Sequence, residues 1–451
     1  MTSRVPIGQL AAFVLPKLAL GLITAPFFYV LPTFYAQNTK ATLAGLGTAL
    51  IASRLFDAFT DPLVGWLSDK TKSPWGARKP WIVGGAILIA ASIFFLFQPG
   101  GDATVTYFLL WSLIFYLGWT MFELPSDAWL TELTRDYNDR SRISGWQGLA
   151  AQAGGFVFFA ASVTGIFGKG MSAELLRAVG WASLIILPGA VVLAAIVVPS
   201  GAQSAKAFET PKLSGLWQAL RSNGALQVLL SSQLLGGFGG GIYLGTQLLL
   251  LDGYFHQGHN FGLIFMGYQV VHFAAMPVWL KIIYRFGKHR SWALSWGLSA
   301  AMTPLSLLVP PGENAIVPLL ILAMIRSAVG GADIVAPRAL MADAIDYGIL
   351  KTGENSAGSY FAASSLAVKF CAAVSSGVAF WLLAMISYDP KPGAVNTSSA
   401  IVGLIVVGML LPMICNVLAA SLIWRFPIDR RRASIIRRRV EGRRSHAAPA
   451  E

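Results

Sequence analysis

Long apolar stretches alternate with short polar segments along the whole chain. Six of these stretches are centred near residues 20, 53, 90, 115, 155 and 188, and six more near residues 238, 270, 300, 327, 370 and 411. A hydrocarbon core about 30 Å thick requires a helix of roughly 20 apolar residues to cross it. The pattern therefore predicts an all-α polytopic membrane protein with twelve transmembrane helices.

A polar segment separates the two sets of six. We expect residues 1–199 to form an N-terminal six-helix half, residues 200–222 a cytoplasmic connector, residues 223–426 a C-terminal six-helix half, and residues 427–451 a basic cytoplasmic tail. Two halves joined by a polar connector are typical of transporters built from repeats.

The charged residues support this topology. Only 12% of residues are charged, and the net charge of +13 comes from short basic clusters between apolar stretches and from the C-terminal tail. The loops after predicted helices 2, 4, 6, 8 and 10 contain Lys70, Lys72, Arg78, Lys79, Arg135, Arg140, Arg142, Lys281, Arg285, Lys288, Arg290 and Lys351, whereas the other loops contain only Lys40, Lys169, Arg177 and Lys391. This asymmetry predicts an inner-membrane protein with cytoplasmic termini, in contact with the lipid bilayer and not with nucleic acid.

Carboxylates inside the second predicted helix indicate a functional site. An ionisable group at the bilayer centre costs about 2.5–3.5 kcal/mol on insertion scales, so its presence needs a reason. Asp57 and Asp61 are four residues apart on one helical face, with Thr60 beside them. Hard oxygen ligands in this arrangement suit a small cation or a shared proton. The alternative is that the carboxylates pair with Arg54 and only stabilise the fold.

Other ionisable residues occur deep in apolar stretches. Glu123 follows Thr120 by three residues in the fourth predicted helix and brings a third carboxylate toward the same cavity. Lys369, far from any loop, is the expected counter-charge, either in charge coupling or in a static ion pair. Asp333 in the tenth predicted helix either faces the solute or forms a gate or packing pair with Arg338.

Enzyme chemistry finds no support in the sequence. It contains no H-E-x-x-H and no G-x-S-x-G motif, and its two cysteines form no disulfide or zinc framework. We therefore expect no enzyme activity and no cofactor beyond a coupling ion. Trp66, Trp119 and Trp146 either line a sugar-sized cavity or pack between helices.

Several motifs resemble those of a known family. Residues 57–66 (DAFTDPLVGW) and 75–81 (WGARKPW) resemble the second helix and following loop of the glycoside–pentoside–hexuronide:cation symporters, which include melibiose permeases, within the major facilitator superfamily. The resemblance continues at residues 123–125, 132–142, 341–347 and 351–353 and at Lys369, across about the whole chain. It implies the major facilitator fold and cation-coupled symport of a sugar-like or other small polar solute by alternating access. We expect a monomer.

The resemblance also implies a set of site residues. Asp57, Thr60, Asp61 and Thr120 match the family's cation ligands, and Asp57 and Asp61 would bind sodium if sodium is the coupling ion. Glu123 matches a carboxylate that bridges the cation and sugar sites, and Lys369 matches a lysine beside this cluster.

The solute half of the predicted site departs from the family pattern. Leu18 follows Lys17 where sugar-binding members have an aspartate, Asp127 stands near the place of a stacking tryptophan, and Gln147 or Gly148 stands where they have an arginine. The resemblance therefore leaves open the solute class, which extends to lipid-like molecules in related symporters, and the choice between sodium and a proton. A proton-coupled exporter of the same superfamily, a channel and a non-transporting sensor remain alternatives.

Overall fold

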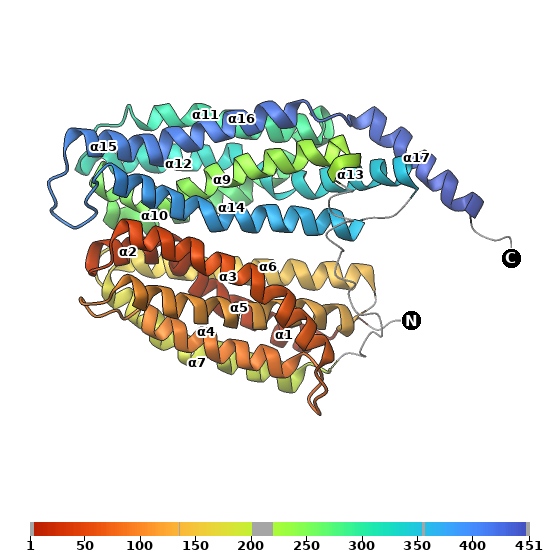
Figure 1. Ribbon diagram of the computed structural model, residues 1–451, viewed down its shortest axis with the longest axis horizontal. Coiled ribbons are helices and arrows are strands. Elements are labelled where there is room, and N and C mark those ends of the chain that lie inside the picture. Colours follow the sequence, from red (N-terminus) through yellow and green to blue (C-terminus); the bar gives the residue numbers. More distant parts are fainter. Residues whose placement is uncertain (1–3, 135, 201–219, 354–356, 448–451) are drawn as a thin grey trace. The chain divides into compact units, whose positions relative to one another are not determined.

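The computed structural model describes residues 4–134, 136–200, 220–353 and 357–447, and this part of the chain is helical without strands (Figure 1). The first six helical segments begin with α1 (Ile7–Tyr29), which continues into α2 (Leu31–Asn38). They continue with α3 (Leu43–Lys70), α4 (Lys79–Leu96), α5 (Val105–Leu133), α6 (Tyr137–Thr164) and α7 (Ala173–Val197).

Six further segments follow, several of them preceded or interrupted by short 3-10 or π-helical pieces. They are α9 (Gly224–Gly253); η1 (Gly258–Asn260) with α10 (Phe261–Phe286); α11 (Lys288–Ser306); η2 (Glu313–Ala315), α12 (Ile316–Gly330), η3 (Gly331–Ile334) and α13 (Ala336–Thr352); α14 (Ala357–Met385); and α15 (Ser398–Ile405), η4 (Val406–Leu410) and α16 (Leu411–Trp424). Within the described residues, six segments and then six more confirm the predicted helix count. Arg135 and residues 201–219, most of the predicted connector, lie outside the described residues.

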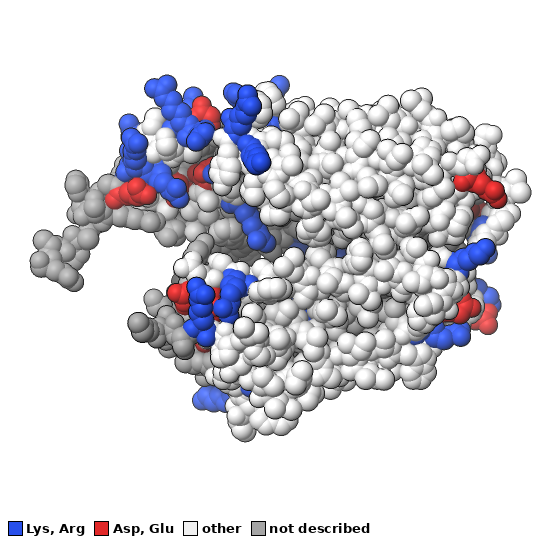
Figure 2. All heavy atoms as spheres, turned by 180° about the vertical axis from the view of Figure 1, so that it is seen from behind, with Lys and Arg blue, Asp and Glu red and all other residues white. Residues whose placement is uncertain are grey.

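The surface fits a multi-pass membrane protein. Nine of the segments in the described ranges are long and apolar enough to cross a membrane. The other three are α3, α6 and α11; α3, for example, contains Arg54, Asp57 and Asp61. On the face shown in Figure 2, charged side chains gather toward the ends of the helices and leave the flanks between them almost free of charge.

Capping side chains define where several helices begin. The residue before each of α3, α5, α6 and α7 accepts a hydrogen bond from a backbone N–H in the first turn. These residues are Thr42, Thr104, Asp136 and Ser172. Such a cap stabilises a helix by about 1 kcal/mol, so each polar residue at the end of a loop also fixes the register of the helix that follows.

The chain divides into two compact units. Unit 1 consists of Met1–Phe208, Leu244–Met266 and Ser376–Gly403. Within it α1 packs on α6 and α7, α4 packs on α5 and α7, and α3 packs on α5. Gly118 of α5 makes a close helix contact possible, because a Cβ there would lie 2.9 Å from both the carbonyl oxygen of Gly85 and the backbone nitrogen of Ile89 on α4.

Polar contacts join the separate stretches of unit 1. Gln37 Nε2, at the end of α2, donates to Asp252 Oδ2 of α9 at 2.7 Å. Trp381 Nε1 of α14 lies 3.0 Å from the carbonyl oxygen of Ala44 and 3.1 Å from Thr48 Oγ1, both on α3. We call these the end contacts of unit 1. They join residues that the sequence assigns to different halves, and the half boundaries themselves stay a prediction.

Unit 2 consists of Glu209–Tyr243, Gly267–Ser375 and Leu404–Glu451, and it has its own apolar core. Within it α11 packs on α12, α13 and α16. The predicted basic tail contains a further helix, α17 (Arg430–Ala447), which packs on α13. Asp429 Oδ1 accepts the backbone N–H of Arg432 at 2.7 Å and so caps α17, and this hydrogen bond lowers the pKa of Asp429.

Candidate functional site

Two helices of unit 1 bring three side-chain oxygens together. Asp57 and Asp61 lie on the face of α3 that meets α5, and Thr120 lies opposite them on α5. Thr120 Oγ1 is 2.9 Å from Asp57 Oδ1 and 3.0 Å from Asp61 Oδ1. Asp57 is 5% exposed and Thr120 is 1% exposed, whereas Asp61 is partly exposed, so the cluster is buried on the side of Asp57 and Thr120.

The Thr120 hydroxyl cannot donate a hydrogen bond to both carboxylates of this oxygen cluster at once. A hydroxyl group has one proton, so Thr120 donates to one of the two carboxylates at a time. The oxygen of the other carboxylate then faces a lone pair of the Thr120 hydroxyl. This contact between two oxygens is repulsive until a positive charge lies between them. A shared proton or a bound cation with a preference for oxygen ligands would supply that charge.

Thr60 belongs to the same segment but is oriented differently. Its Oγ1 donates to the backbone oxygen of Asp57 at 3.2 Å, one turn back along α3. The described residues contain no group of three or more His, Cys, Asp or Glu side chains that could hold a metal ion. Of the four predicted cation ligands, the side-chain oxygens of Asp57, Asp61 and Thr120 lie together, whereas the hydroxyl of Thr60 is directed to the backbone of α3.

Arg54 lies one turn before Asp57 on α3. Its guanidinium group is 4.8 Å from the ring centre of Phe28 and 4.6 Å from that of Tyr116. Such cation–π contacts stabilise a guanidinium group that is withdrawn from water. Trp119 packs nearby, with its ring edge-on to Phe28 at 6.3 Å.

A partly buried ion pair lies one turn from Thr120. Lys17 Nζ of α1 forms an ion pair with Glu123 Oε2 of α5 and lies 5.5 Å from the ring centre of Phe122. Asp127, exposed one turn further along α5, is close enough to interact electrostatically with both charged groups. The sequence pattern does not indicate this pairing of Lys17. The available signal was that Lys17 is the one charged residue in the apolar stretch 7–29.

The remaining predicted residues lie in unit 2. Lys369 is on α14 and Asp333 is in η3, between α12 and α13. Trp292 Nε1 of α11 donates to Asp333 Oδ1 at 2.5 Å, so Asp333 ties the break between α12 and α13 to a neighbouring helix. The expected coupling of Lys369 to the carboxylates of α3 stays a prediction.

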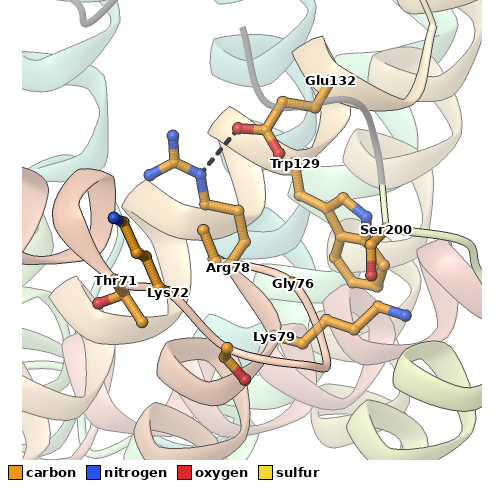
Figure 3. A pocket seen from close by; sticks show the side chains of 10 residues that line it. Thr71, Lys72, Gly76, Arg78, Lys79, Trp129, Glu132 and Ser200 are labelled. Carbon is orange, nitrogen blue, oxygen red and sulfur yellow. Dashed lines mark hydrogen bonds and ion pairs between the residues drawn. The ribbon is translucent and has the colours of Figure 1, made fainter. Parts of the chain in front are cut away.

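The loop between α3 and α4, which contains the motif of residues 75–81, lines a pocket at the end of unit 1 (Figure 3). Arg78 donates to Glu132 Oε1 at 2.9 Å, as the dashed line in Figure 3 shows, and to Asp69 Oδ1 at 2.5 Å. Burial lowers the pKa of Arg78, but its hydrogen bonds and charge attraction to Asp69 and Glu132 raise it more. Lys79 Nζ donates to the carbonyl oxygen of Ala195 at 2.8 Å. The loop thus connects α3, α4, α5 and α7.

Comparison with known proteins identifies relatives of this chain. A family profile described as "MFS/sugar transport protein" matches residues 12–430. The chain is 35% identical over 130 residues to "Uncharacterized symporter sll1374" of Synechocystis, an alignment that covers 27% of this chain and 24% of that protein. It is 22% identical over 410 residues to "Glucuronide carrier protein homolog" of Escherichia coli, covering 88% of this chain and 87% of that protein.

Solved structures show the same fold. A D323A mutant of the nucleoside transporter NupG matches with a TM-score of 0.68 and 15% identity, covering 93% of this chain and 100% of that one. The likeness confirms the predicted major facilitator fold. The alignments with the first three sequence relatives cover 24% to 34% of the length of those proteins.

Proposed function

This chain belongs to the MFS/sugar transport protein family, a family of transporters and not of enzymes, and we propose that it couples the uptake of a sugar-like or other small polar solute to a cation. Its relatives include symporters, which supports cotransport in one direction. The observation that carries the proposal is the hydroxyl of Thr120, which lies within hydrogen-bond distance of both Asp57 and Asp61 inside the protein.

In this proposal the oxygen cluster binds the coupling ion. Sodium would be held by oxygens of Asp57, Asp61 and Thr120, with Thr60 beside them on α3, whereas a proton would be shared between the two carboxylates. Either ion supplies the positive charge that one hydroxyl proton cannot deliver to two carboxylates at once.

The proposed solute site lies beside the ion-binding cluster. Glu123 and Asp127 provide acceptors, Trp119 provides an aromatic face, and Lys17 holds Glu123 in place. The side-chain nitrogen of Gln147 on α6 is buried and has no hydrogen-bond partner within the described residues. An amide donor is suited to a hydroxyl or carbonyl oxygen, which supports a neutral polar solute.

Coupling follows from linkage between the two sites. Thr120 and Glu123 are one turn apart on α5, so an ion that repositions the Thr120 oxygen also acts on the helix turn that carries Glu123. If the ion tightens solute binding by some factor, the solute must tighten ion binding by the same factor. Lys369 and Asp333 are proposed to contribute from unit 2, Lys369 as a charge partner of the carboxylates and Asp333 as a solute contact.

Alternating access completes the proposal. We place the chain in the inner membrane as a monomer with cytoplasmic termini, because the basic loops fall on that side. The end contacts of unit 1, Gln37–Asp252 and Trp381–Thr48, involve segments next to the basic-poor loops. Exposing the sites to that side would require these contacts to break.

The test compares two aspartate variants in proteoliposomes. Asp57→Asn should abolish gradient-driven accumulation of solute while retaining solute counterflow, because it removes the ion-binding charge and not the solute site. Asp102→Asn, at an exposed loop carboxylate that pairs with Lys40, is the matched control and should behave as the unmodified protein. Full accumulation by the Asp57 variant would refute the ion assignment. Solute efflux driven by an inward proton gradient would instead identify the exporter.

A further inference from the structure

The C-terminal helix α17 has an unusually basic exposed face. Seven arginines between residues 425 and 440 are exposed, whereas the acidic residues of residues 425–441 are Asp429 and Glu441. The exposed arginines are Arg425, Arg430, Arg431, Arg432, Arg437, Arg438 and Arg439. In Figure 2, the Lys and Arg side chains of unit 2 gather at the end where α17 lies.

The helix is anchored to unit 2 by its opposite face. Ile436 and Val440 are four residues apart, so they share one face of α17, and they are 8% and 3% exposed. Both belong to the apolar core that also contains Leu340 and Met341 of α13. The arginines are therefore presented on a helix that is packed against the core of unit 2.

Exposed aromatic residues surround the start of this helix. Trp424 ends α16, and Tyr284 and Phe286 lie at the end of α10; all three are more than half exposed. Arg430 Nη1 donates to the carbonyl oxygen of Tyr284 at 3.0 Å, which joins α17 to the end of α10. Arg290 lies 6.0 Å from the ring centre of Trp424. Aromatic rings at the ends of membrane-spanning helices mark the depth of the lipid headgroups.

We propose that the exposed face of α17 and the adjoining ends of α10 and α16 form a binding surface for anionic phospholipid headgroups, and that lipid bound there stabilises unit 2 through Ile436 and Val440. The charges are complementary, because an arginine-rich surface faces phosphates at the level marked by the aromatic rings. A headgroup receives both arginine hydrogen bonds and contacts with the interfacial aromatic rings, whereas free phosphate would receive only the hydrogen bonds. Each basic residue near an anionic membrane surface strengthens binding about fivefold.

The experiment uses the purified full chain in a neutral detergent. Phosphatidylglycerol or phosphatidylcholine is titrated in, and lipid retention is measured by native mass spectrometry together with the thermal unfolding midpoint. Phosphatidylglycerol should bind and raise the midpoint, and this effect should weaken at high salt. The R431Q/R432Q/R438Q/R439Q variant should bind phosphatidylglycerol at least about tenfold more weakly, and the matched four-lysine variant should stay within about threefold of the unmodified chain.

A second variant separates binding from stabilisation. I436Q/V440Q retains every arginine but disrupts the docked face, so it should bind phosphatidylglycerol without the rise in midpoint. Equal effects of the two lipids, unchanged binding by the four-glutamine variant, or the same midpoint rise with inorganic phosphate or an oligonucleotide would overturn the lipid surface. A full midpoint rise in I436Q/V440Q would overturn the link to unit 2.

Discussion

Thr120→Val tests the oxygen cluster most directly. Valine has nearly the shape of threonine, so the substitution replaces one hydroxyl by a methyl group in a side chain that is 1% exposed. That hydroxyl lies 2.9 Å and 3.0 Å from two carboxylate oxygens. A hydrogen bond to a charged group contributes about 1.5–3 kcal/mol, which corresponds to roughly a 10- to 150-fold change in an equilibrium constant. We expect ion affinity to fall by that factor.

Thr60→Val provides the comparison on the neighbouring helix. The Thr60 hydroxyl donates to a backbone oxygen of its own helix at 3.2 Å, so its loss removes a neutral hydrogen bond worth about 0.5–1.5 kcal/mol. Most of this lost hydrogen-bond energy lowers the stability of α3 and does not change ion binding. We expect the ion affinity of the Thr60→Val variant to change less than that of the Thr120→Val variant. Thr120→Ser retains the hydroxyl and should retain most of the affinity.

Ion affinity is measured on purified protein by sodium titration at fixed pH and by pH titration without sodium. The thermal unfolding midpoint reports ion binding because a ligand of the folded state stabilises it by mass action. Whichever ion fails to shift the midpoint of the unmodified chain is not the coupling ion. Ion affinity in Thr120→Val equal to that of the unmodified chain, or a larger loss in Thr60→Val, would refute the reasoning.

Three further predictions concern contacts that hold the sites in place. Lys17→Met leaves the partly buried Glu123 carboxylate without its ion-pair partner and should destabilise the protein by about 1–3 kcal/mol in chemical unfolding, whereas K17M/E123Q should recover most of that loss. Gln37→Cys with Asp252→Cys, in a background without the native cysteines, should lose uptake upon oxidation and regain it with a reductant, because the disulfide would hold an end contact closed. Arg78→Gln removes charged hydrogen bonds to two acidic residues and should lower stability by about 1.5–3 kcal/mol, measured by the unfolding midpoint.

The helix count could be predicted from the sequence because the membrane imposes length and hydrophobicity on every crossing segment. The pattern identified α3 although its five charged residues reduce its hydropathy, since large apolar residues such as Leu55, Phe59 and Leu63 lie on its exposed face. The breaks within segments could not be predicted in the same way. The turn η3 around Asp333, for example, is tied to α11 by Trp292, a contact across 41 residues that no local pattern encodes.

The site could be predicted in part. The four-residue spacing of Asp57 and Asp61 places both carboxylates on one helical face, which helix geometry alone indicates. Thr120 came from the family resemblance, because 63 residues separate it from Asp57 and their contact depends on how α3 packs on α5. The pairing of Lys17 with Glu123 spans 106 residues, and Lys369 appeared the more obvious counter-charge because it lies far from any loop.

These positions place the proposed ion and solute sites on one turn of a single helix. Thr120 contacts the carboxylates of α3, and Glu123, three residues later on α5, contacts Lys17 of α1. Three residues advance a helix by about 4.5 Å, and hydrogen bonds within the turn resist any change in that spacing. An ion that draws Thr120 toward α3 therefore moves the backbone of Glu123 with it and changes its contact with α1. Linkage between ion and solute thus requires only that α5 shift between α3 and α1, and Gly118, packed against α4 at the start of this turn, limits the direction of that shift.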